Sequence, residues 1–115
     1  MNFGTQNKEG YAVIQVHNER LDSLIAPDLK SELVLATENG QKNIVLDISE
    51  CTYCDSSGLS ALLVGNRLCE NVSGQFVLCG LTPMVDKLIK LAMLDTVLTI
   101  TTDEKEASKL LNKDA

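Results

Sequence analysis

The stretch Cys54-Asp55-Ser56-Ser57-Gly58-Leu59 stands between two segments of different pattern. An apolar, β-branched run of strand length, Ile44 to Ile48, precedes it, and a helical run from Leu59 to Glu70 follows. An acidic residue and two hydroxyls therefore mark a strand-to-helix junction. Backbone N–H groups at the start of a helix lack intrahelical partners and carry partial positive charge. The junction thus suits a capping side chain or an added phosphate.

The rest of the chain repeats this alternation of strand and helix. Lys8-Glu9-Gly10 is a turn signal, which predicts an antiparallel hairpin from Phe3 to about Gln6 and from Tyr11 to Val16. Further strands are predicted over 43–48, 75–79 and 96–100, with helices beginning near residues 27, 59, 83 and 104. Alternating strands and helices imply right-handed crossovers. We therefore expect a single α/β domain over residues 1–115, with a mixed, mostly parallel sheet, about four helices mainly on one face, and a frayed tail over about 112–115.

Composition supports a small domain with an aliphatic core and argues against several functions. Apolar residues make up 44% of the chain, whereas aromatic residues make up 3%. The net charge of −6 disfavours binding to the phosphate backbone of nucleic acids. No apolar run approaches the roughly 18 residues of a membrane helix, and the N-terminus lacks the pattern of a signal peptide. We expect a cytoplasmic protein with no cofactor, no nucleic-acid partner and no membrane insertion.

The helix after the junction has two distinct sides when it is stepped at 100° per residue. One set should pack on the sheet: Gly58, Leu59, Leu62, Gly65, Asn66 and Cys69. The other set should face solvent: Ser56, Ser57, Ser60, Val64, Arg67 and Asn71. We expect Gly58 and Gly65 to allow close approach of the backbone, and Val64 to offer a partner the one apolar contact on the outer side.

Three segments together resemble the signature of the STAS domain, and more narrowly that of the bacterial anti-sigma factor antagonists: Leu46-Asp47-Ile48-Ser49, Asp55-Ser56-Ser57-Gly58-Leu59 and Ala61-Leu62-Leu63. Leu21-Asp22 and Cys79-Gly80-Leu81-Thr82-Pro83 also fit that family, so the resemblance covers essentially the whole chain. It implies that Ser56 is phosphorylated by a partner anti-sigma kinase. It also implies that only the unphosphorylated form binds the kinase and frees its sigma factor, that a serine phosphatase resets the switch, and that the protein is not an enzyme.

The family pattern is not matched everywhere. The segment Glu19-Arg20-Leu21-Asp22 lacks the Gly that many antagonists carry there. Ile25 replaces a Thr or Ser, and Ser60 replaces a Gly. These positions lie on or near the presumed docking surface, so they bear on the choice of partner and not on the fold.

The chemistry of the junction agrees with a binding switch. A phosphate on Ser56 would add roughly 1.5 to 2 negative charges at pH 7, which helix N–H groups could receive and an acidic partner would repel. Ser57 is then the better candidate for the structural cap. Asp55 has two interpretations: it caps the helix, or its carboxylate orients the Ser56 hydroxyl or contacts a kinase-bound metal. Asp22 also has two interpretations, as a turn former or as part of an acidic rim near Ser56. The predicted docking surface around Ser56 comprises Asp22, Asp55, Ser57, Ser60, Val64 and Arg67.

Two alternatives remain open from the sequence. One is a constitutive STAS interaction subunit, for instance of a lipid-transport or sensory complex, without a phosphoswitch. The other is a thiol redox or metal-binding protein that uses Cys51 and Cys54. Against it, Cys69 and Cys79 form no second close pair and His17 is the only histidine, so we expect no metal site and reduced, partly buried thiols. Catalysis by serine is disfavoured because the chain has no Gly-x-Ser-x-Gly elbow.

Overall fold

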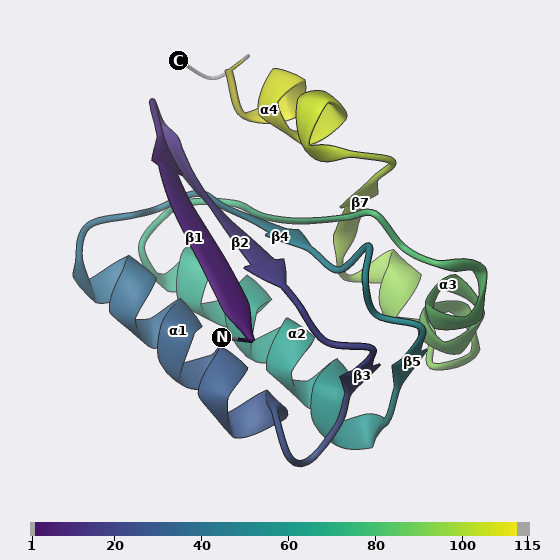
Figure 1. The fold of residues 1–115 in the computed structure, drawn as a ribbon. Helices are drawn as coiled ribbons and strands as arrows, with labels where there is room; N and C mark the ends of the chain where they lie inside the picture. Colours follow the sequence, from purple (N-terminus) through teal and green to yellow (C-terminus); the bar gives the residue numbers. More distant parts are fainter. Residues whose placement is uncertain (1, 113–115) are drawn as a thin grey trace.

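The computed structural model describes residues 2–112 of the chain (Figure 1). Residues 113–115, which make up most of the tail that we expect to fray, lie outside the described residues. The elements follow in the order β1 (Phe3–Lys8), β2 (Tyr11–Val16), β3 (Arg20–Leu21), α1 (Ala26–Glu38), β4 (Ile44–Asp47), β5 (Tyr53–Cys54), α2 (Ser56–Asn71), β6 (Phe76–Cys79), α3 (Pro83–Leu91), the 3₁₀-helix η1 (Leu94–Thr96), β7 (Thr99–Thr101) and α4 (Glu104–Asn112).

In the described part of the chain, the main sheet has five strands in the order β1-β2-β4-β6-β7. The β1–β2 hairpin is antiparallel and the other three pairings are parallel. Val13 pairs with Val45 and Val45 with Val77, so equivalent side chains form rows across the central strands. The predicted mixed, mostly parallel sheet with an N-terminal hairpin is confirmed.

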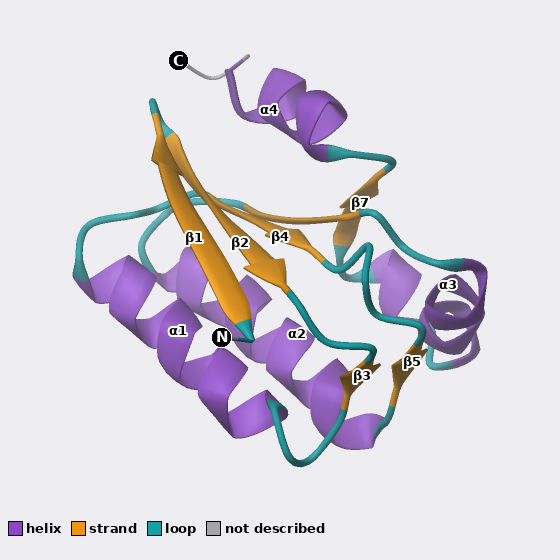
Figure 2. Cartoon of the chain, in the orientation of Figure 1, coloured by secondary structure: helices purple, strands orange, loops and turns teal. Residues whose placement is uncertain are grey.

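Both faces of the sheet are covered, which explains why its central strands are apolar throughout. Ile14, Leu46 and Leu78 face one side, where they join a core cluster with the buried residues of α1, α2 and α3. Val13, Val45 and Val77 face the other side and join Ala107 and Leu111 of α4. Figure 2 shows α1 and α2 side by side below the sheet, with α4 above it. The prediction of helices mainly on one face is therefore confirmed, since α4 alone among the described helices covers the second face.

The local structure departs from the sequence pattern at several points, and the predicted position of the last strand is wrong. The strand predicted over 96–100 lies at Thr99–Thr101, because residues 94–96 form η1 after Met93 adopts a left-handed conformation with φ of 61°. Thr82 stands at the N-cap of α3 without a side-chain capping bond, because its hydroxyl donates to the Cys51 carbonyl at 2.7 Å. Ala92 and Leu110 are exposed, although each follows a buried residue, Ile89 and Ala107, at a spacing of three.

A second, two-stranded sheet was not predicted from the sequence. The segment around residues 18–23, which looks like a polar loop, contains β3, and β3 pairs in parallel with β5. Arg20 lies opposite Tyr53, and Leu21 lies opposite Cys54. Each of these short strands leads towards a helix, so the small sheet holds the first turns of α1 and α2 together.

Candidate functional site

The start of α2 is packed so closely on the small sheet that glycine is required at residue 58. A Cβ added to Gly58 would lie 2.7 Å from Cys54 Sγ and 2.9 Å from Leu21 Cγ, and closer still to the Leu21 carbonyl oxygen. Further along the helix, a Cβ on Gly65 would lie 2.6 Å from Cε1 of Phe76. The predicted role of Gly58 and Gly65 in close packing is confirmed, and the junction has a fixed position relative to both sheets.

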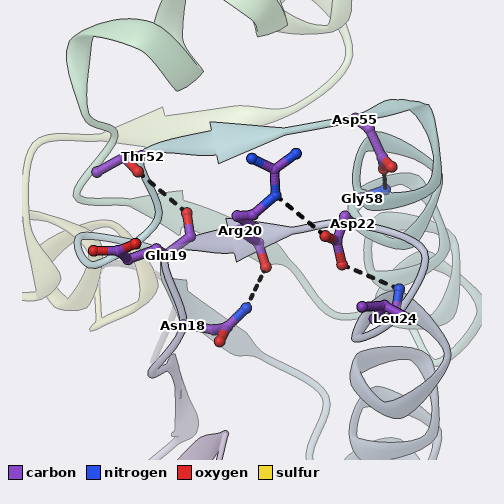
Figure 3. Close-up of polar contacts among 8 residues, drawn as sticks. All are labelled: Asn18, Glu19, Arg20, Asp22, Leu24, Thr52, Asp55 and Gly58. Atoms are coloured by element: carbon purple, nitrogen blue, oxygen red, sulfur yellow. Dashed lines mark hydrogen bonds and ion pairs between the residues drawn. The ribbon is translucent and has the colours of Figure 1, made fainter.

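Asp55 is the residue that caps α2. Its backbone is extended, and its Oδ1 accepts a hydrogen bond from the Gly58 N–H at 3.0 Å (Figure 3). Its main-chain oxygen accepts the first bond of the helix, from the Leu59 N–H at 3.0 Å. The prediction that Ser57 is the cap is wrong, because α2 already begins at Ser56 and Ser57 is its second residue. Of the roles considered for Asp55, the structure assigns it the cap.

Ser56 is exposed, and within residues 2–112 its hydroxyl makes no hydrogen bond. The first turns of α1 and α2 enclose a shallow depression beside it, which we call the serine depression. It is lined by Ser23, Ala26, Pro27, Lys30, Ser56, Ser57 and Ser60. The structure thus brings together Ser56, Ser57 and Ser60, the hydroxyl-bearing residues of the predicted site.

Asp22 is a turn former with an additional ion pair. Its Oδ1 accepts from the Leu24 N–H at 3.0 Å, and its main-chain oxygen accepts from the Ala26 N–H at 2.8 Å. Its Oδ2 lies 3.4 Å from Arg20 Nε (Figure 3). Only 16% of the Asp22 side chain is exposed, so the turn-former interpretation fits better than an acidic rim.

Three residues near Ser56 were missed by the sequence interpretation. The Arg20 guanidinium lies over the Tyr53 ring, 4.5 Å from its centroid, a cation–π contact across the small sheet. Leu24 is 87% exposed at the tip of the turn that Asp22 holds. The sequence analysis did not predict that β3 pairs with β5, and this pairing is what places Arg20 opposite Tyr53.

Val64 and Arg67 lie further along α2, in a second depression that we call the helix groove. It is lined by Ser60, Leu63, Val64, Asn66, Arg67, Leu68, Glu70, Asn71 and Val97. Four of the six predicted docking residues therefore line one or both of two depressions that share Ser60, whereas Asp22 and Asp55 line neither.

The predicted phase of α2 is correct for most positions and wrong for Val64, which we expected to face solvent. Its buried residues are Gly58, Ala61, Leu62, Gly65 and Cys69. Val64, however, is half-buried, whereas Leu63 is 38% exposed. Leu63 is therefore the more accessible apolar side chain on the outer side.

The four cysteines are free and buried. Burial raises the pKa of Cys51 to about 11 and that of Cys54 to about 12. Both thiols are therefore protonated at neutral pH, whereas redox exchange and zinc binding use the thiolate. Among residues 2–112 there is no group of three or more His, Cys, Asp or Glu side chains that could hold a metal ion. The same part of the chain contains no helix with the length and apolar character that a bilayer crossing requires.

Comparison with known proteins agrees with this geometry. The family model described as "Mlab, STAS domain" matches residues 4–101. BtrV of Bordetella bronchiseptica, a candidate anti-sigma factor antagonist, is 26% identical over 88 residues, which are 76% of this chain and 76% of BtrV.

Solved structures show the same fold. An anti-sigma-factor antagonist (STAS) domain protein from Planctomyces limnophilus superposes with a TM-score of 0.86 at 18% identity, over 96% of this chain and 97% of that one. The Bacillus cell fate determinant SpoIIAA in its phosphorylated form superposes with a TM-score of 0.71 at 20% identity, over 94% of this chain and 98% of SpoIIAA. Because the family model matches most of its length, the chain belongs to the STAS domain family.

Proposed function

We propose that this protein is a non-enzymatic anti-sigma factor antagonist that acts in the cytoplasm and is switched by phosphorylation at Ser56. In its unphosphorylated form it binds a partner anti-sigma kinase and so releases the sigma factor. The kinase transfers the γ-phosphoryl group of ATP to the Ser56 hydroxyl oxygen, with release of ADP and a proton, and binding is then lost. A serine phosphatase hydrolyses the ester and restores the binding form.

One observation carries this proposal. Ser56 is exposed, and its hydroxyl has no hydrogen-bond partner among the described residues, at a helix start whose cap is a different residue, Asp55. A kinase can therefore modify Ser56 without breaking a bond that the fold uses. BtrV and SpoIIAA add support from the comparisons, the latter because it is known in a phosphorylated form.

The effect of the phosphate on binding follows from its charge. It adds roughly 1.5 to 2 negative charges at pH 7 to a chain whose net charge is already −6. The new charge lies next to Asp55, and a docked partner would have to desolvate it. Unpaired charge in a closed interface is strongly unfavourable, so the complex is destabilised while the free protein keeps its fold.

The docking surface centres on Ser56 and includes the side chains that the small sheet presents. Leu24 is largely exposed, and Arg20 and Tyr53 are stacked on each other with 61% and 36% exposed. Arg and Tyr are frequent energetic centres of interfaces, and a stacked Arg loses less side-chain freedom on binding. With these residues we include Ser57, Ser60, Val64 and Arg67, which line the two depressions. We also include Asp22 and Asp55, which hold the turn before α1 and the start of α2.

The test uses the cognate kinase with ATP. Intact mass should show a single added phosphate on the wild type and on Ser57→Ala and Ser60→Ala, and none on Ser56→Ala. By calorimetry, Ser56→Asp should weaken kinase binding by about a hundredfold or more, whereas the matched control Ser60→Asp should have a smaller effect. Tight binding by Ser56→Asp, together with no phosphate on the wild type, would reject the switch and favour a constitutive STAS interaction subunit.

A further inference from the structure

Of the residues that the structure describes, Lys30 is the only basic one that lines the serine depression. It lies one turn into α1 and is half-buried. Figure 1 shows α1 and α2 side by side, with their N-terminal ends at the same end of the molecule. Residues four apart on a helix share a face, so Ala26 and Lys30 on α1 lie across the depression from Ser56 and Ser60 on α2.

The ammonium group of Lys30 has no partner among residues 2–112. Its acidic neighbours on α1, Asp28 and Glu32, are two residues away on either side, a spacing that places them on other faces of the helix. The positions three and four residues away are Ala26, Pro27, Leu33 and Val34, which carry no charge. By contrast, Lys90 of α3 has an acid at the correct spacing and pairs with Asp86 at 3.0 Å.

The other charges around the depression do not compete for this role. Arg20 is held by Asp22 and by the Tyr53 ring. Asp55 caps α2. In the unmodified protein, therefore, Lys30 and Ser56 line the same depression, and neither the ammonium group nor the hydroxyl has a partner among residues 2–112.

We infer that Lys30 is the counter-charge that holds the phosphoryl group of modified Ser56 inside the serine depression. The inference rests on the proposed phosphorylation of Ser56 and extends it to a second helix. Packed helices lie about 8–10 Å apart, a gap that the flexible stem of a lysine can bridge. The ion pair would fix the phosphate above Ala26 and Pro27, so that modification alters the surface of α1 as well as that of α2. Lys30 is thus a positioning residue for the phosphorylated state and has no part in kinase chemistry.

The experiment places phosphoserine at position 56 of the full chain during translation, so that it needs no kinase. A ³¹P NMR titration then gives the second pKa of the phosphate, which is about 6 in the absence of neighbours. An adjacent cation lowers this pKa, so Lys30→Gln should raise it by about 0.5 to 1 relative to the wild type. Lys87→Gln is the matched control, an exposed helical lysine outside the depression, and should change the pKa by about 0.1 at most.

A second readout separates positioning from a general effect on the fold. Phosphorylation should shift the amide resonances of residues 26–30 in the wild type, and these shifts should be lost in Lys30→Gln. A second pKa equal in Lys30→Gln and wild type would overturn the inference. If the Lys30 effect is present but no kinase modifies Ser56, only the proposed function fails; if Ser56 is modified and Lys30→Gln has no effect, only this inference fails.

Discussion

Replacing Gly58 with alanine sets two effects of opposite sign against each other at the start of α2. Alanine is the better helix former by about 0.5–1 kcal/mol, so helix propensity alone predicts a more stable protein. The new Cβ, however, would lie 2.7 Å from Cys54 Sγ and 2.9 Å from Leu21 Cγ, and closer still to the Leu21 carbonyl. Relief requires β3 to move away from α2, which strains its pairing with β5. Overpacking of this kind costs about 1–3 kcal/mol, so a net loss of about 1–2 kcal/mol should result.

Urea unfolding followed by circular dichroism measures this difference directly. The midpoint should fall without a change in slope, and the melting temperature should drop by about 3–8 °C for a domain of this size. Ser60→Ala is the matched control, because it also introduces alanine into the first turns of α2 but at an exposed position. It should be neutral or slightly stabilising. If Gly58→Ala is as stable as the wild type, the close approach of β3 to α2 is refuted.

Three further predictions follow from burial and capping. Asp55→Ala should lower the free energy of unfolding by about 1 kcal/mol and Ser57→Ala by less than about 0.5, as measured by urea unfolding; equal losses would contradict the cap at Asp55. Leu62→Ala, at a fully buried position, should cost about 2–5 kcal/mol in guanidinium unfolding, and a loss below about 1 kcal/mol would mean that the helix phase is wrong. Burial raises the pKa of Cys69 from 9.0 to about 11, so the unfolded chain loses its thiol proton first and stability should fall between pH 9 and 11. Cys69→Ala should make that fall shallower, and an unchanged slope in a pH series of urea curves would count against the shift.

The main sheet could be predicted because its strands carry their own signal. Buried central strands are continuous apolar runs, and β2, β4 and β6 each show one. The small sheet carries no such signal. Its strands have two residues each, too few for any periodicity, and the paired residues Arg20 and Tyr53 are far apart in the chain. Only the folded structure brings Arg20 and Tyr53 together.

The half-buried Val64 and the exposed Leu63 show a second limit of predicting burial from helical periodicity. A helical wheel treats α2 as packed on one flat surface, whereas α2 contacts both the main sheet and α1. The segment after α3 adds a further neighbour, since Val97 lines the helix groove beside Val64. Val97 falls within the strand predicted over 96–100, so the sequence offered no reason to place it beside α2. Val64 is therefore partly covered while Leu63 remains accessible.

The identity of the cap determines what Ser56 is free to do. Asp, Ser and Asn cap helices about equally well, so the sequence alone cannot choose between Asp55 and Ser57. The contact of Gly58 with Leu21 makes the choice, because it fixes where the first turn of α2 begins. A serine that served as the cap would exchange its hydroxyl for phosphate oxygens on phosphorylation, so modification would alter the contacts that begin the helix. With Asp55 as the cap, Ser56 can accept a phosphate while the capping bond to the Gly58 N–H stays as it is, and the change in free energy falls on the complex with the partner.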